Sequence, residues 1–218
     1  MEIKIHTIVF VLAVANISYG KPKNNYKKLE KKGDRIGVYH LKNGRISCGE
    51  AGAPPMKKVD PKTFRVIGGS QYAFDKNKVY FPISEDCVDT QVSGYCYCSK
   101  YVVMGAEPRS FRYLGKDYGV DRKRVFFRGE PIKSAFPSSF TVIGKKTKTF
   151  IAKDHKRVYW FDNILEQAKP TSFSIQIDKR GGYLLRDSES SWRFQPPNKP
   201  VKLHQSKRQK SGKKNGSR

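Results

Sequence analysis

The sequence predicts an all-β protein made of tandem short antiparallel β-meander or hairpin repeats, stacked as a solenoid-like or propeller-like array, with a disulfide-stapled insertion. Two short motifs recur along the chain in a fixed order, and short runs of β-branched and aromatic residues follow them. No segment has a long apolar period of 3.6 residues, which disfavours helices. Aromatic residues make up 12% of the 218 residues, and a wholly disordered chain would be poor in them.

The first twenty residues have the layout of a secretory signal peptide. Lys4 precedes the apolar run 8–15, and two small-x-small cleavage options follow at 13–15 and 18–20. The run is too short for a hydrocarbon layer, which needs about 20 residues. The alternative is a buried strand or helix of the fold. We expect a signal peptide at 1–20 and a basic linker at 21–33.

The first recurring motif is an Asp followed, after three residues, by a β-branched or small residue and then an aromatic residue. Its five copies begin at Asp34, Asp75, Asp121, Asp154 and Asp187 and end at Tyr39, Tyr80, Phe126, Tyr159 and Trp192. The second motif, x-Pro-x-[Ser/Thr]-Phe, precedes the last four copies, at 60–64, 107–111, 136–140 and 169–173. These landmarks place repeats near 34–46, 59–81, 106–128, 135–161 and 168–194, within a β-repeat domain at 34–195.

Each full repeat can be interpreted as about three short strands. The Pro suits the first turn of a short helix, for which Asp60 is the best cap. A strand begins at the motif Phe and ends at a Gly, and a second strand precedes the Asp. The Asp-x-x-x segment then makes a hairpin turn, because Asp accepts hydrogen bonds from its own following backbone, and a third strand follows. One repeat cannot bury its aromatic residues alone, so the copies must stack or form a ring.

Four cysteines follow the leader, and an even count in an exported chain indicates two disulfides. Cys96 and Cys98 lie two apart on an expected strand and point to opposite faces, so they should not pair with each other. Either Cys48–Cys96 pairs with Cys87–Cys98, or Cys48–Cys98 with Cys87–Cys96; the second is slightly favoured by its compact loop. A zinc site is disfavoured by the spacing. The segment 82–105 is therefore predicted to be a stapled insertion.

The sequence lacks the usual signatures of catalysis. His40, His155 and His204 stand in unrelated contexts, and no zinc-protease, nucleophile-elbow or phosphate-loop motif is present. Turn formation explains the repeated Asp residues better than calcium, because Lys and Arg fill the gaps between them. We expect no enzyme activity, no catalytic residue, no metal and no cofactor, and no small-molecule substrate is evident.

The formal net charge of +25 divides into +5 at 21–35, +13 at 36–201 and +7 at 202–218. Hairpin bases recur at the same place in successive repeats and would form a basic edge if the repeats stack. The tail at 196–218 is polar and is expected to be disordered. The predicted anion-binding residues are Lys76, Lys78, Arg122, Lys123, Arg124, Lys156 and Arg157, with Lys207, Arg208, Lys210, Lys213 and Lys214 in the tail. The plainer interpretation is solvated charge that keeps the protein soluble.

The strings Tyr72-Ala-Phe-Asp75-Lys-Asn-Lys-Val79-Tyr80 and Asp154-His-Lys-Arg-Val158-Tyr159, each with its preceding Pro motif, resemble the DKNYY family of bacterial exported repeat proteins. The resemblance covers roughly 59–194, with a weak copy at 34–46. The chain departs from the family string because Lys-Val or Arg-Val stands before the aromatic residue. The resemblance implies a structural or binding repeat, in the periplasm or secreted, and no known reaction.

These observations favour a non-enzymatic exported repeat protein that binds an anionic surface or polymer, such as envelope lipid, acidic glycan or nucleic acid. The alternative is a protein–protein interaction module of the cell envelope, an adaptor, immunity or inhibitor protein, that uses the 82–105 insertion. A secreted basic hydrolase is the third hypothesis.

Overall fold

The computed structural model describes residues 25–89, 94–144, 147–179 and 181–203. These residues form five small antiparallel sheets, and their one helical element is the 3-10 turn Pro170–Ser172. None of the helical structure in this part of the chain is long and apolar enough to span a membrane. The expected signal peptide and the tail bases from Lys207 to Lys214 lie outside the described residues.

The sheets are numbered here in chain order. The first contains β2 (Arg35–Ile36), β3 (Tyr39–Lys42) and β4 (Arg45–Cys48). The second has the order β1-β5-β6-β7-β8, with β1 (Tyr26–Lys27), β5 (Arg65–Ile67), β6 (Ala73–Phe74), β7 (Val79–Val88) and β8 (Tyr95–Val102). The third contains β9 (Arg112–Gly115), β10 (Tyr118–Val120), β11 (Val125–Phe127) and β12 (Glu130–Pro131). The fourth contains β13 (Thr141–Ile143), β14 (Ile151–Lys153), β15 (Val158–Trp160) and β16 (Asn163–Ile164). The fifth contains β17 (Ser174–Ile177), β18 (Tyr183–Arg186), β19 (Ser191–Phe194) and β20 (Val201–Leu203).

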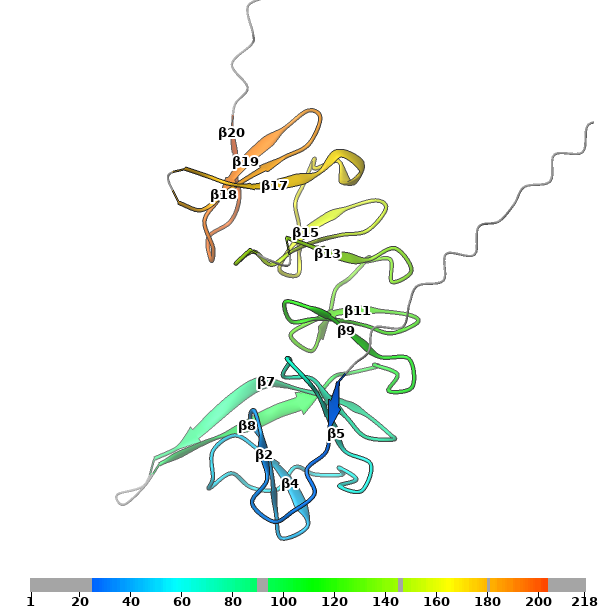
Figure 1. Ribbon diagram of the computed structural model, residues 1–218, viewed down its shortest axis with the longest axis vertical. Coiled ribbons are helices and arrows are strands. Elements are labelled where there is room, and N and C mark those ends of the chain that lie inside the picture. The colour runs from blue at the N-terminus through cyan, green and yellow to red at the C-terminus, as the bar shows by residue number, and fades with distance from the viewer. Residues whose placement is uncertain (1–24, 90–93, 145–146, 180, 204–218) are drawn as a thin grey trace, which may run out of the picture.

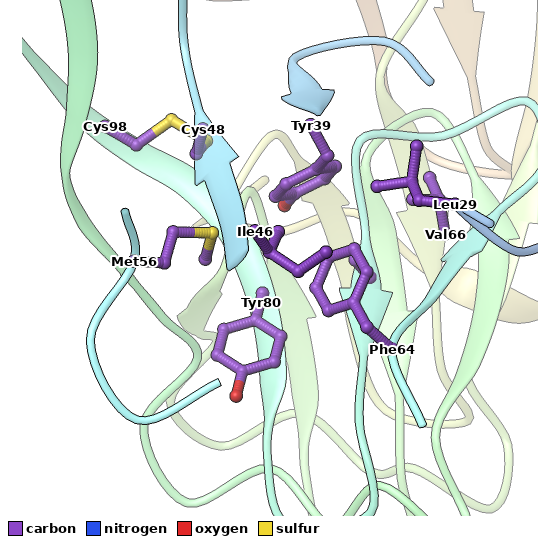
Figure 2. Packing of buried hydrophobic residues seen from close by; sticks show 10 residues of the cluster. Leu29, Tyr39, Ile46, Cys48, Met56, Phe64, Val66, Tyr80 and Cys98 are labelled. Atoms are coloured by element: carbon purple, nitrogen blue, oxygen red, sulfur yellow. A yellow bond between two sulfur atoms is a disulfide. The ribbon is translucent and has the colours of Figure 1, made fainter. Parts of the chain in front are cut away.

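The sheets follow one another along the long axis in an open row, with the first and fifth at opposite ends (Figure 1). This arrangement does not close into the ring that a propeller-like array requires. A hydrophobic cluster lies between each pair of successive sheets. Figure 2 shows the cluster between the first two sheets, where the rings of Tyr39, Phe64 and Tyr80 surround Ile46.

Burial on both faces explains why the third strand of a repeat is apolar throughout rather than alternating. On β7, Tyr80 packs toward the first sheet, whereas Val79 and Phe81 pack toward the third. On β11, Phe126 belongs to the cluster shared with the second sheet, and Val125 to the one shared with the fourth. Strands buried on both faces read as continuous hydrophobic runs.

The three-strand meander is confirmed in the second to fifth sheets, but four details differ from expectation. A short fourth strand, β12, β16 or β20, closes the last three sheets, and β20 lies in the segment expected to be disordered. β1 lies in the expected linker, and the ring of Tyr26 packs edge-on against that of Phe74 with 5.1 Å between the ring centres. The short helices expected at the Pro motifs are turns in three copies and a 3-10 turn in the last. The copy beginning at Asp34 makes no Asp hairpin, because Oδ2 of Asp34 accepts from the backbone N–H groups of Glu30 and Lys31, both at 2.8 Å.

The expected insertion is a two-stranded antiparallel ribbon formed by β7 and β8, whose register shifts between Tyr80 and Glu85 and which projects sideways from the row (Figure 1). The structure pairs Cys48 with Cys98 and Cys87 with Cys96, the second of the two expected alternatives. The first bond ties the ribbon to β4, and the second joins its two strands. The ribbon is thereby fixed to the first sheet.

The two disulfides are expected to differ in accessibility to reductant, because Cys48 and Cys98 are 2% and 5% exposed, whereas Cys87 lies on the exposed part of the ribbon. Mild reduction of the folded protein followed by alkylation should label Cys87 and Cys96 first, since exchange requires access to the sulfur. Peptide mass mapping would measure the order. Equal labelling of all four residues in folded protein would contradict the expectation.

Candidate functional site

The Asp residues of the last four repeats each organise a hairpin turn. One carboxylate oxygen of Asp75 accepts from the backbone N–H groups of Asn77 and Lys78 at 2.7 and 2.8 Å. Asp121, Asp154 and the degenerate copy at Asp187 repeat this arrangement at 2.6–2.8 Å. The predicted turn-forming role of these Asp residues is confirmed.

The other carboxylate oxygen holds the Pro motif of the same repeat. Oδ2 of Asp75 accepts from the backbone N–H of Asp60 at 2.8 Å, and the hydroxyl of Thr63 accepts from the N–H of Lys76 at 3.2 Å. The corresponding bonds to the Asp join Glu107 to Asp121, Phe136 to Asp154 and Lys169 to Asp187. The corresponding hydroxyls are those of Ser110, Ser139 and Ser172. We call this loop-to-hairpin connection the clamp; it explains why the two motifs recur together.

A tyrosine completes two of the four clamps. The hydroxyls of Tyr80 and Tyr159 donate to Oδ2 of Asp75 and Asp154, each at 2.7 Å. Burial, followed by the neighbouring carboxylate, raises the pKa of both tyrosines well above the ordinary value, so the phenols remain donors. Burial alone would raise the pKa of Asp154, but the hydrogen bonds from Tyr159 and from backbone N–H groups lower it overall. The Asp carboxylates are therefore occupied by protein donors, and no group of three metal-ligating side chains gathers in the described ranges.

Several predicted hairpin bases are engaged by the adjacent Pro motif. Lys76 lies 3.3 Å from the carboxylate of Asp60, and Arg122 lies 3.9 Å from that of Glu107. In the third clamp a cation–π contact replaces the ion pair, because Nζ of Lys156 lies 4.6 Å from the ring centre of Phe136.

The two arginines at the ends of their turns also contact the protein. Arg157 donates to the carbonyl of Ser134 at 2.7 Å. The guanidinium of Arg124 lies over Gly105, where an added Cβ would stand 1.4 Å from it. In the last clamp the ion pair is reversed, because Lys169 of the Pro motif pairs with Glu189 of the hairpin.

The hairpins themselves lie on one side of the row, toward the right of Figure 1. Their Pro motifs lie beside them, because the clamps join the two. We call this side the hairpin edge. It brings the seven predicted hairpin bases to one side of the molecule. The five predicted tail bases, from Lys207 to Lys214, lie outside the described residues.

Sequence reasoning missed three buried tyrosines that join neighbouring sheets. Tyr39 donates to the carbonyl of Gln71 at 2.9 Å, and Tyr72 donates to that of Asp117 at 3.1 Å. Tyr118 donates to the carbonyls of Phe150 and Phe161 at 2.8 and 2.6 Å. A signal for two of them was present, since Tyr72 and Tyr118 both stand three residues before a clamp Asp.

The second group missed is basic and lies on the first sheet. Arg35, His40, Lys42 and Arg45 share its outer face. No repeat pattern marks them, because they belong to the divergent first copy.

The comparisons with known proteins agree with the repeat architecture. The model of the DKNYY family matches residues 90–195, which contain the last three clamps. The match does not extend over the clamp at 60–78. No curated protein and no solved structure gave a significant match to the chain. Over residues 90–195, just under half of its length, the chain is therefore similar to the DKNYY family.

Proposed function

We propose that this chain is a non-enzymatic, exported repeat protein whose solenoid-like row of sheets binds anionic surfaces or polymers through the hairpin edge. The proposal is supported by the formal charge of +25 and by bases that recur on one side of the row. The clamps support a structural role for the repeated Asp residues, because hydrogen bonds from the protein already occupy these carboxylates. Export rests on the leader pattern and on the family resemblance.

The observation that carries the proposal is a group of solvent-accessible bases at the first two clamps, exposed except for the half-buried Lys78, that have no acidic partner within the described residues. Lys62 and Lys78 belong to the first clamp and Arg109 and Lys123 to the second. A polyanion can displace counterions from such bases without breaking an internal ion pair. This excess of unpaired positive charge is absent from the fifth sheet, where Thr171 stands at the position of Lys62 and Glu189 at the position of Lys123. Binding should therefore centre on the second and third sheets.

The test compares heparin retention of the full chain with that of the double variant Lys78→Gln/Lys123→Gln. The variant should elute at clearly lower salt, because two unpaired edge charges are lost. The matched control is Lys133→Gln/Lys199→Gln, which removes the same charge from exposed positions outside the hairpins. Equal shifts in the two variants would show binding by total charge alone, and elution of the unmodified chain at low salt would exclude polyanion binding.

The ribbon supports a second candidate, a protein–protein module of the cell envelope. β8 pairs with one edge of β7, and β6 pairs with the other edge at its first two residues alone. From Phe81 onward, the edge of β7 opposite β8 therefore has no strand beside it in the described structure. A groove of about 780 Å³ follows this edge, with Ile83 and Glu85 on one wall and Gly68 on another. An extended peptide can add to such an edge through main-chain hydrogen bonds.

A stoichiometric, salt-resistant protein partner of the full chain would favour this second candidate. Loss of that partner in Cys87→Ser/Cys96→Ser, together with its retention in Lys78→Gln/Lys123→Gln, would place it on the ribbon. The opposite pattern would place it on the hairpin edge.

A further inference from the structure

The outer face of the first sheet is basic, whereas its inner face supplies the core. Tyr39 and Ile46 point inward and are at most 2% exposed. Because side chains alternate along a strand, the residues between them project from the other face. Cross-strand pairing aligns Arg35, His40 and Ser47 in one row and Lys42 with Arg45 in the next. Four nitrogen-bearing side chains thus share one small surface.

A cavity of about 310 Å³ opens at this surface. It is lined by Lys32, Gly33, Arg35, His40, Leu41, Lys42 and Ala51, with no acidic side chain among them. Within the described residues, none of Lys32, Arg35 and Lys42 forms an ion pair, which distinguishes them from the hairpin bases Lys76 and Arg122. Nε of Arg35 donates to the carbonyl of Gly37 at 3.0 Å, which fixes one side of the guanidinium group.

His40 provides the independent sign of a ligand site. Its side chain lines the cavity and is only 9% exposed. Its Nε2 atom is shielded from solvent and has no hydrogen-bond partner in the described structure. Buried polar atoms are normally paired, so an unpaired one beside a cavity indicates a site for a polar ligand.

We propose that this cavity, which we call the first-sheet pocket, binds a phosphate group, with Arg35 and Lys42 contacting its oxygens and His40 donating from Nε2 after a turn of its ring into the cavity. The fork of an Arg side chain matches phosphate geometry, and three bases with a histidine suit a dianion better than a single carboxylate. The volume is at the lower end of ligand sites, so one phosphoryl group with a small substituent fits. The pocket uses none of the hairpin-edge residues, and the two proposals can fail separately.

The histidine supplies a direct measurement. Burial lowers the pKa of His40, and the charges of Arg35 on β2 and Lys42 on β3 lower it further, while the carbonyl of Val38 opposes them. Arg45 and Ser47 on β4 face the same ring. A bound dianion would stabilise the imidazolium, so phosphate should raise the pKa of His40. Binding far from the pocket would leave it unchanged.

The experiment titrates inorganic phosphate into the full chain while the imidazole resonances of His40 are followed by NMR. Saturable shifts and a raised pKa are expected, and Arg35→Gln should weaken phosphate affinity about tenfold or more. Lys42→Gln is the second variant, and Lys57→Gln removes the same charge outside the pocket as a control. Amide spectra would show that each variant is folded. The proposal would be overturned if the His40 resonances did not shift with phosphate, or if Arg35→Gln and Lys57→Gln lowered the phosphate affinity equally.

A second arm identifies the source of the phosphate. Vesicles of phosphatidylcholine with and without phosphatidic acid are compared with phenyl phosphate in solution. If the protein sediments with phosphatidic acid vesicles and Arg35→Gln abolishes this binding, the pocket would be assigned to a lipid headgroup. Binding of phenyl phosphate without vesicle binding would assign it to a soluble phosphate ester. Binding of neither, with no response to inorganic phosphate, would exclude the site.

Discussion

Asp154→Ala should lower the free energy of unfolding by about 3–5 kcal/mol, because it leaves several clamp donors without an acceptor. Asp154 is 3% exposed and accepts from three backbone N–H groups and from the hydroxyl of Tyr159 at 2.7–3.1 Å. Denaturant unfolding followed by far-UV circular dichroism would measure the loss. Asp162→Ala is the control, since Asp162 is exposed and its carboxylate accepts, among the described residues, one hydrogen bond, from the side chain of Asn163. A loss below about 1 kcal/mol for Asp154→Ala would contradict the structural role of the clamp.

The same clamp predicts the direction in which the stability of the folded protein changes with pH. The pKa of Asp154 is lowered from its ordinary value of 3.8, so the ionised form stabilises the folded protein. That stabilisation is fully present above the unfolded pKa and is lost as pH falls through the lower folded pKa. Asp154→Asn removes the titrating group, so the stability difference from the unmodified protein should shrink below about pH 4. A difference that grows on acidification would contradict this assignment.

Tyr118→Phe should cost about 1–3 kcal/mol, because it removes the hydroxyl that joins the third and fourth sheets and leaves two carbonyls without this donor. The side chain is fully buried, and burial raises the pKa of Tyr118 well above its ordinary value, so it is a neutral donor. Tyr97→Phe is the control, since the Tyr97 hydroxyl makes no hydrogen bond within the described residues. Equal effects of the two changes on the denaturation midpoint would show that the hydroxyl of Tyr118 adds nothing. The fourth sheet has Ile151 at the corresponding place, so its junction with the fifth lacks this bond.

The repeated motifs predicted the meanders and the Asp turns because both depend on residues close in sequence. The partners of the second carboxylate oxygen could not be predicted in the same way, since Asp60 and Asp75 meet only after the intervening strands have formed. The very short strands β1 and β20 were missed because their pairing partners define them, not their own propensity. For the same reason, the sequence placed them in a linker and a tail.

The charge pattern was predicted less well than the fold. Counting hairpin bases treats each as available, but Lys76 and Arg122 face acids that stand just before Pro. The sequence carried this signal, because the position before Pro is acidic in two repeats and becomes Lys169 where the hairpin carries Glu189. The first-sheet pocket had no comparable signal, since it depends on cross-strand neighbours of His40.

The clamps also bear on how the chain folds. Each joins residues only 14–18 positions apart, so most of a repeat forms through short loop closures. The hydroxyl bonds of Tyr39, Tyr72 and Tyr118 to the next sheet span 32–57 positions, and the Cys48–Cys98 bond spans 50. Low contact order favours rapid assembly, and nearest-neighbour interfaces let it spread from one nucleated sheet to the next. Closure between the first two sheets also requires formation of the Cys48–Cys98 disulfide, and because disulfide formation takes seconds to hours, we expect it to be the slow event in forming the native array.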